Sequence, residues 1–508
     1  MSGRKETGHK RKLYVPARYV FLAIRVLDMF LSSFTEGVMP LAITSMVRTT
    51  TTTTSDTTTA ANVSLTSSDM CPGSPEVTNN SSSSDSKGGD FDWSELTQSY
   101  VSNGPTYGSV LTMMLAARLV LLWSPKLMMA AGGILTVALT ALTPALAHWD
   151  VRALIAARVL LGIPSGINMP AMFALDSTWF PPNERQQMVG VIFGSLNVAS
   201  IASSSVTGYL IERFGWEDVF YIFAVMKFVG LCLWIFIIHD SPGKHPRISE
   251  EEKNYITSTV KKETEVKLQV PWLQIFLSAP VWAYLSVSIS NVWIMFLLSV
   301  ELPTYLTKML YYSTTDAGYL VSACNAMAFI VQVSSGFLSQ WLRGKGYISQ
   351  LTSYRIFNAV VTLGSAAAII GITLSGCDTT AIVVLLLFIK GFQSVIIAGS
   401  FLNHMDLAIN FVPTLSGING TVSSIVGIIS PTIAAAIINN NQTLTAWKEV
   451  FYISAIVSAV PYVIFLIFGS VDEQPWNKVP NKDETLDPEE PQVKSKQSSV
   501  SSEDVNKT

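Results

Sequence analysis

The sequence predicts an all-α membrane protein with 12 transmembrane helices arranged in two halves of six. Three observations support this fold class. The chain of 508 residues is 49% hydrophobic and only 14% charged, whereas soluble proteins carry about 25% charged residues. Apolar stretches of about 20 residues, long enough to span a bilayer, recur along the chain. One charged stretch divides them into two sets of six.

The N-terminal half begins with an apolar stretch that follows six basic residues within positions 1–18. The stretch is long and no small-residue cleavage site closes it, so we expect an uncleaved first span and not a signal peptide. Five more apolar stretches follow it. The six expected spans of this half, which covers 19–239, lie near residues 19–46, 99–122, 126–148, 151–175, 188–210 and 219–239.

The charged stretch DSPGKHPRISEEEKNYITSTVKKETEVKLQVPW belongs to a linker that we place at residues 240–280. A second set of six spans occupies 281–470, and a polar tail covers 471–508. The spans of this C-terminal half are expected near residues 281–306, 317–341, 354–374, 380–402, 414–438 and 449–470.

Basic residues predict the orientation, because cytoplasmic loops retain Lys and Arg. The N-terminus, the linker and the turn with Arg343 and Lys345 fall on one side, which is therefore the predicted cytoplasmic side. Residues 49–95, rich in Thr, Ser and Asn, fall on the other side and have too few apolar residues to fold. We expect this loop and the cytoplasmic tail to be disordered. Glycosylation sequons on the non-cytoplasmic side agree with this topology: Asn62, Asn79, Asn80 and Asn441.

An enzymatic or nucleic-acid function has little support. The chain contains no P-loop and no HExxH motif, so we expect no catalytic residue, no metal site and no cofactor. The net charge of −3 is too small to suggest a nucleic-acid partner. Four scattered cysteines do not form a disulfide framework. Cys71 and Cys377 could both lie outside and form one disulfide.

Arg158 stands inside the expected fourth span, in the stretch ARVLLGIPSGINMP. Counting from Asp150 places it about 12 Å below the non-cytoplasmic helix end, too deep to reach the surface easily. One interpretation is a structural ion pair with a neighbouring helix. The other, which we favour, is an anion-binding charge that faces a water-filled cavity. Ser165 lies seven residues later on nearly the same face, and Gly162, Gly166 and Pro170 permit close helix contact or a bend.

Other charges also fall inside expected spans. Arg25 and Asp28 are three residues apart, which favours a local ion pair. Glu36 lies deeper in the same span, at a depth similar to that of Arg158. In the stretch NHMDLA, His404 and Asp406 fall at a cytoplasmic helix end, where a histidine is more often capping or solvated than a proton carrier.

Several motifs, in the same order along nearly the whole chain, resemble the anion-cation symporter family of the major facilitator superfamily, which contains sialin, the vesicular glutamate transporters and the sodium-phosphate cotransporters. They include ARVLLGIPSGINMPAM, WFPPNER, DSPGKHPRISEEEKNYI and NHMDLA. The resemblance implies a major facilitator fold, alternating access between the two halves, and coupling to protons or sodium. It also implies that Arg158 faces the central cavity and holds an organic anion.

The chain departs from the family pattern at functional positions. Ser165 stands where the family has a glutamate implicated in proton coupling, and Glu36 stands where the first span has an arginine. Asn291 stands where the glutamate transporters have a seventh-span arginine. We therefore expect a divergent member, with Glu36 paired to Arg158 in the empty site and protonated during coupling.

These observations together predict a secondary active transporter of small organic anions, sialic-acid-like or other carboxylates, or of inorganic phosphate. We expect it to act as a monomer in the lipid bilayer of the plasma membrane or of lysosomes or vesicles. The alternative is a transporter-like receptor or assembly protein that no longer transports. Candidate substrate-binding residues are Arg158, Ser165 and Asn291, and candidate coupling residues are Glu36, Asp406 and His404.

Overall fold

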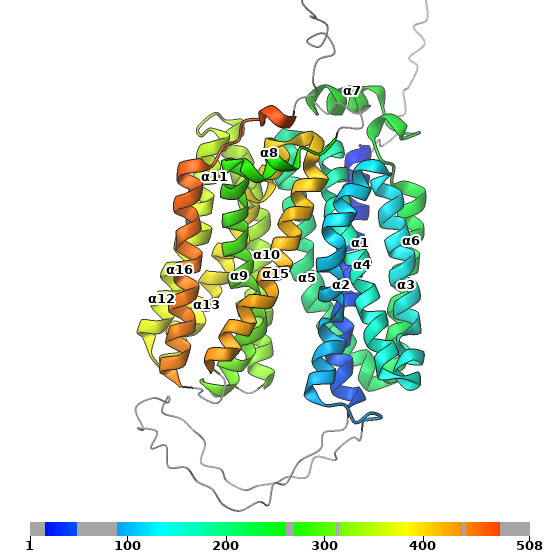
Figure 1. Ribbon diagram of the computed structural model, residues 1–508, viewed down its shortest axis with the longest axis vertical. Coiled ribbons are helices and arrows are strands. Elements are labelled where there is room, and N and C mark those ends of the chain that lie inside the picture. The colour runs from blue at the N-terminus through cyan, green and yellow to red at the C-terminus, as the bar shows by residue number, and fades with distance from the viewer. Residues whose placement is uncertain are drawn as a thin grey trace, which may run out of the picture.

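The computed structural model describes residues 16–47, 89–260, 269–310, 312, 314–438 and 443–477. Within these residues, 12 helical segments are long and apolar enough to cross a membrane, and they stand side by side in one bundle (Figure 1). The predictions for Cys71, for the four sequons, for most of the first loop and for nearly all of the tail lie outside the described residues. Cys377 is disulfide-bonded, whereas Cys232 and Cys324 are free thiols.

The helices of the N-terminal half begin and end at residues suited to helix ends. The side chains of Ser94, Ser124 and Asp150 each accept a hydrogen bond from a backbone amide of the following helix, which satisfies an otherwise unpaired donor. Gly215, with φ of 91°, makes the turn between the last two helices. The six helices are α1 (Ala17–Met46), α2 (Glu95–Leu122), α3 (Pro125–Trp149), α4 (Val151–Trp179), α5 (Pro182–Phe214) and α6 (Trp216–Ile237).

The linker forms short helices that lie across one end of the bundle (Figure 1). They are η1 (Pro242–Lys244), α7 (Glu250–Thr259) and α8 (Trp272–Leu277). Ser249 caps α7. The Glu252 carboxylate accepts hydrogen bonds from the backbone amides of Ala17 (2.8 Å) and Arg18 (3.1 Å). The linker therefore caps the first transmembrane helix, and its end of the bundle is the predicted cytoplasmic end.

The C-terminal half contains two interrupted spans. A π-helical segment divides the ninth span, and 3-10 turns divide the tenth. Both interruptions break the regular hydrogen-bond ladder inside the bundle, where other groups of the protein satisfy the freed backbone. In chain order the elements are α9 (Ala279–Lys308), α10 (Thr314–Gly344), α11 (Gln350–Ala359), η2 (Val360–Gly364), α12 (Ser365–Ser375), α13 (Thr379–Ser394), η3 (Val395–Ile397), η4 (Ser400–Leu402), α14 (Asn403–Leu407), η5 (Ile409–Phe411), α15 (Val412–Ile438), α16 (Leu444–Phe468) and η6 (Pro475–Asn477).

The two halves repeat one packing scheme. In the N-terminal half α1 packs on α5 and α6, α2 on α4, and α3 on α4 and α6. In the C-terminal half α9 packs on α15 and α16, α10 on α13, and α12 on α13 and α16. These pairs correspond in order along the chain. The arrangement confirms the predicted fold of two six-helix halves.

Helices α2 and α4 approach closely at the glycines of the fourth span. A Cβ atom added to Gly162 would lie 2.3 Å from the carbonyl oxygen of Pro105, and one added to Gly166 would lie 2.1 Å from Oγ1 of Thr112. Both separations are far below van der Waals contact. The glycine spacing is therefore needed for helix packing, and it fixes the position of α4, which carries Arg158.

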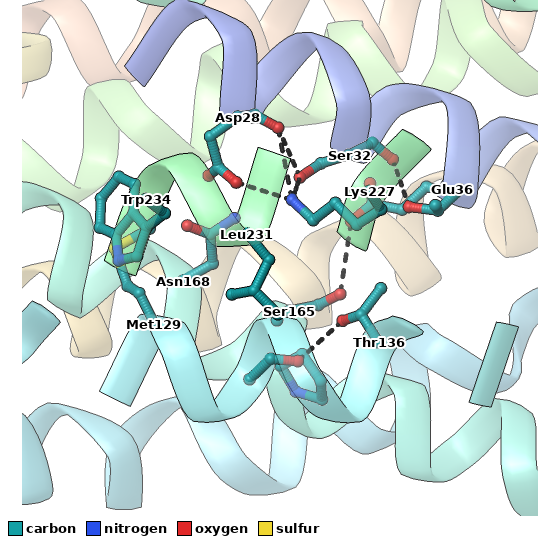
Figure 2. Close-up of a pocket in the computed structure, with 14 residues that line it drawn as sticks. Asp28, Ser32, Glu36, Met129, Thr136, Ser165, Asn168, Lys227, Leu231 and Trp234 are labelled. Carbon is teal, nitrogen blue, oxygen red and sulfur yellow. Dashed lines mark hydrogen bonds and ion pairs between the residues drawn. The ribbon is translucent and has the colours of Figure 1, made fainter. Parts of the chain in front are cut away.

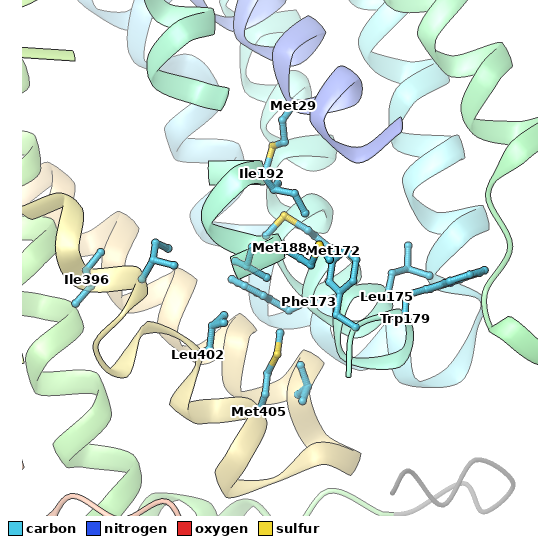
Figure 3. Close-up of a cluster of buried hydrophobic side chains, with 14 of the residues drawn as sticks. Met29, Met172, Phe173, Leu175, Trp179, Met188, Ile192, Ile396, Leu402 and Met405 are labelled. Carbon is cyan, nitrogen blue, oxygen red and sulfur yellow. The ribbon is translucent and has the colours of Figure 1, made fainter. Parts of the chain in front are cut away.

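The halves are sealed together at the predicted cytoplasmic end. One core of buried apolar side chains, the inter-half core, joins Phe173, Trp179 and Met188 of the N-terminal half to Leu402 and Met405 of the C-terminal half (Figure 3). Toward the other end each half has its own core instead, and the two sets of helices diverge (Figure 1). The structure is therefore closed on the predicted cytoplasmic side.

Candidate anion-binding site

Two adjoining cavities lie between the helices. The Arg158 cavity, about 450 Å³, is lined mainly by α1 to α4. The central cavity, about 460 Å³, is lined by both halves. They share five lining residues, which are Met113, Met169, Leu196, Phe296 and Ser424. Each volume falls within the range of small-molecule sites.

Arg158 is 3% exposed and lines the cavity named after it. Its Nε donates a hydrogen bond to the carbonyl oxygen of Val101 at 3.2 Å. Among the described residues this is the one hydrogen bond of the guanidinium, and no carboxylate lies within ion-pair distance. The Val101 contact fixes the orientation of the group. It leaves the two Nη groups as donors for an anion, which a guanidinium can bind through two parallel bonds.

Glu36 does not pair with Arg158, so that expectation was wrong. Its side chain is exposed toward the cavities and accepts a hydrogen bond from the Ser165 hydroxyl at 3.5 Å. The reason is geometric, because Ser165 lies seven residues beyond Arg158, about 10 Å further along α4. The two charges share one cavity at different levels. Glu36 can therefore change its charge without breaking an ion pair.

Beside Glu36, a pocket of about 50 Å³ contains an ionic network (Figure 2). Lys227 of α6 is 6% exposed, and its Nζ donates to Oδ1 of Asp28 and to the hydroxyl of Ser32, both at 2.7 Å. Arg25 lies 3.5 Å from Asp28 and 3.6 Å from Asp176. The expected pair of Arg25 and Asp28 is therefore present within a larger network that ties α1 to α4 and α6.

Asp28, Ser32 and Glu36 lie at intervals of four residues, so they form one oxygen-bearing face of α1. Lys227 contacts the first two of these residues. All four line the pocket in Figure 2, which shares Glu36 and Ser165 with the Arg158 cavity. The network and the candidate anion site are thus continuous.

The central cavity has a different chemistry. Asn291 of α9 lines it and donates to Oε1 of Gln393 at 2.6 Å. Gln393 in turn donates to the hydroxyl of Ser365 at 2.9 Å. Between the halves, Asn197 donates to Oε1 of Gln332 at 2.9 Å. Apart from Lys390, the polar groups of this cavity are therefore amides and hydroxyls, whereas the Arg158 cavity also contains Glu36 beside its arginine.

His404 and Asp406 lie elsewhere. His404 is 0% exposed, with its ring 4.8 Å from that of Phe173 and 5.4 Å from that of Tyr284. His404 is therefore not solvated, because the inter-half core covers this helix end, and its Nδ1 lies 3.2 Å from the carbonyl oxygen of Phe401. Asp406 accepts a hydrogen bond from the Tyr354 hydroxyl at 2.6 Å. Neither residue lines either of the two cavities.

Sequence reasoning missed three residues of these sites. Lys227 and Lys390 are each a single charged residue within an expected span, and that signal could have identified both. Gln393 carried no signal, because an uncharged amide is common in a helix. Among the described residues, no three His, Cys, Asp or Glu side chains come together as a metal site.

A transporter is the class of protein that this fold and site define. The family model of the Major Facilitator Superfamily matches residues 29–431. Two solved structures agree on the fold. A bacterial homologue of the iron transporter ferroportin matches with a TM-score of 0.63 and 12% identity over 89% of this chain and 99% of its own. The proton:xylose symporter XylE matches with a TM-score of 0.64 and 12% identity over 89% of this chain and 96% of its own. At such low identity these two show the fold alone.

Relatives narrow the assignment. Sialin from Homo sapiens is 30% identical over 76% of this chain and 78% of its own length. Sodium-dependent phosphate transport protein 3 from Mus musculus is 28% identical (76% and 81%), and vesicular glutamate transporter 2 from Homo sapiens is 27% identical (76% and 67%). The chain belongs to the Major Facilitator Superfamily and is a divergent member of its anion-cation symporter family. It is accordingly a multi-pass membrane protein.

Proposed function

We propose that the protein is a secondary active transporter of small organic anions, such as sialic-acid-like or other carboxylates, or of inorganic phosphate. The observation that carries this proposal is Arg158. It is a buried cation in a cavity, held by one backbone carbonyl, without a carboxylate partner among the described residues. An unpaired charge at this depth is costly, and an anionic substrate would neutralise it. The phosphate and glutamate transporters among its relatives support the same substrate class.

Alternating access is the transport mechanism that we propose. The inter-half core closes one end of the bundle, and the cavities lie between the halves and within the N-terminal half. Binding of an anion would favour closure of the other end, and opening of the inter-half core would then release the anion into the cytoplasm. The interrupted tenth span contributes Leu402 and Met405 to that core.

Coupling by protonation of Glu36 is the mechanism that we favour over sodium coupling. Charged groups face Glu36 from three helices: Asp28 on its own helix, Arg158 on α4 and Lys227 on α6. Protonation would remove one negative charge beside Arg158 and strengthen attraction of an anion. His404 and Asp406 are weaker candidates because they do not line the cavities.

Uptake into proteoliposomes tests the proposed function. The panel consists of radiolabelled sialic acid, glutamate, urate and phosphate, under separate proton and sodium gradients. We expect Arg158→Lys to reduce uptake of the transported anion at least about tenfold, because an ammonium cannot reproduce the planar fork of donors. Arg152→Lys, an exposed position at the start of the same helix, is the matched control and should transport normally.

Two outcomes would contradict the proposal. Unchanged uptake by Arg158→Ala at equal protein density would leave Arg158 with a structural role. Saturable binding of a panel anion without flux would favour the receptor alternative. The same panel decides between organic anions and phosphate.

A further inference from the structure

Lys390 of α13 is a second unpaired cation in the substrate path. It lines the central cavity and is the one charged side chain among the described residues that do so. No carboxylate of the described residues lies within ion-pair distance of it. A lysine within a membrane-spanning helix normally pairs or faces a functional cavity. Lys390 meets the second condition.

Other polar groups of this cavity also lack partners within the described residues. Tyr284 is 2% exposed and its hydroxyl has no hydrogen-bond partner, and the same holds for the buried Oδ1 atom of Asn419. Both residues line the central cavity. A buried polar group without a protein partner is unfavourable, so it favours binding of a polar ligand group or of water. The cavity therefore contains a charge and two polar side chains ready to bind a polar group.

The rest of the lining suits an apolar body. Phe173, Phe193, Phe296 and Phe401 all line the central cavity, together with several methionines and aliphatic residues. Such a cavity accepts the hydrocarbon part of a ligand and uses few polar groups to orient it. A fully hydrated ion such as phosphate would leave this surface uncovered.

Arg158 and Lys390 belong to opposite halves. Arg158 is in α4 and Lys390 is in α13, and they line adjoining cavities that share five residues. Counted from Asp150 and Asp378, which precede the two helices, they lie at depths of about 12 and 18 Å. An elongated ligand in the joined cavities could contact both cations and thereby connect the two halves.

We infer that Lys390 is a second anion-binding residue, and that the protein recognises an organic dianion with an apolar body and an anionic group at each end. One group binds Arg158 and the other binds Lys390. This inference rests on the proposed anion transport. With Glu36 protonated, the three side chains carry a net charge of +2, which a dianion neutralises. The loaded site then contains one dianion and one proton.

Thermal stabilisation of the purified full-length protein by two matched probes tests this inference. Terephthalate carries a carboxylate at each end of a benzene ring, and 4-carbamoylbenzoate has nearly the same shape with one carboxylate replaced by a neutral amide. We expect terephthalate to bind the unmodified protein about tenfold or more tightly, since a charged partner of a buried ammonium contributes at least this factor. Lys390→Gln should abolish the preference, and Lys390→Arg should restore most of it.

Lys448→Gln, at an exposed lysine of the same half, is the control and should keep the preference. Equal binding of the two probes by the unmodified protein would overturn the inference, even if Lys390→Gln failed to fold. Retention of the preference in Lys390→Gln, or no stabilisation by terephthalate, would also overturn it. Binding of 4-carbamoylbenzoate that is lost in Arg158→Gln would show that the first anion site exists, so failure of the inference is distinct from failure of the proposed function.

Discussion

The interiors of the two halves differ in the kind of polar contact they contain. In the N-terminal half, Asp28, Lys227, Arg25 and Asp176 form ion pairs within the spans. In the C-terminal half, neutral hydrogen bonds take this place: Asn291 to Gln393, Gln393 to Ser365, Trp293 to Ser454, and Ser290 to Ser458. Identical packing schemes thus enclose different chemistries.

This difference indicates which half of the protein can change its charge during transport. Buried ion pairs lose hydration and depend strongly on their partners, so a change at Glu36 alters the electrostatics of the whole N-terminal network. Neutral amides adapt to a ligand at smaller cost. We therefore propose that coupling depends on the N-terminal half and adjustment to ligand shape on the C-terminal half.

The largest effect should follow from breaking the ionic network. Asp28→Leu leaves Lys227 without a carboxylate at 2.7 Å, so we expect a loss of about 3–5 kcal/mol in stability. The double variant Asp28→Leu/Lys227→Leu should lose much less than the sum of the two single variants. Thermal or denaturant unfolding in detergent measures all three.

An exposed pair in the same half provides the control. His148 and Glu217 lie 2.6 Å apart with both side chains about half exposed, and Glu217→Leu should cost about 1 kcal/mol or less. Two results would mean that burial does not make the ionic network more important than an exposed ion pair. One is a loss of stability in the double variant that equals the sum of the two single losses. The other is a loss in Glu217→Leu as large as that in Asp28→Leu.

A smaller effect concerns Glu36. We expect uptake by the unmodified protein to rise as the pH on the non-cytoplasmic side falls, because protonation favours the anion. Glu36→Gln imitates the protonated form, so its uptake should be independent of pH while binding remains. Proteoliposome uptake at a series of external pH values measures this. Asp406→Asn, which lines neither cavity, should keep the pH dependence. A Glu36→Gln protein with an unchanged pH profile would exclude Glu36 as the coupling group.

The smallest effect should come from the C-terminal half. Asn291→Leu removes the donor to Gln393, and we expect a loss of about 1–2 kcal/mol in stability. Gln393 keeps its hydrogen bond to Ser365. We therefore expect a change in the KM for the anion and a smaller change in the pH dependence of uptake. A destabilisation as large as that of Asp28→Leu would contradict the contrast between the halves.

The fold could be predicted because the bilayer sets the length of each span. The stretch expected at 126–148 is α3 (Pro125–Trp149), and that expected at 151–175 is α4 (Val151–Trp179). Helix α5 (Pro182–Phe214) exceeds its expected 188–210, since polar residues continue the helix beyond the apolar stretch. The π-helical segment at Val360–Gly364 has no recognisable pattern in the sequence.

The site could be predicted only residue by residue. Arg158 was identified because any arginine within a span is unfavourable in lipid. The residue that contacts Arg158 was not identified, because similar depths in the bilayer do not fix how two helices are rotated about their axes. Glu36 contacts Ser165 instead of Arg158. Lys227 was visible as a charge, but its contact with Asp28 joins α6 to α1 across 199 residues of sequence.

The contact between Glu252 and the start of α1 has a consequence for biosynthesis. Glu252 follows Ala17 by 235 residues, so about 10 to 50 s of translation separate the two at ordinary ribosomal speed. Until then the first backbone amides of α1 lack their hydrogen bonds to this carboxylate. The nascent N-terminal half acquires this cap when the linker leaves the ribosome, before any C-terminal helix has been inserted.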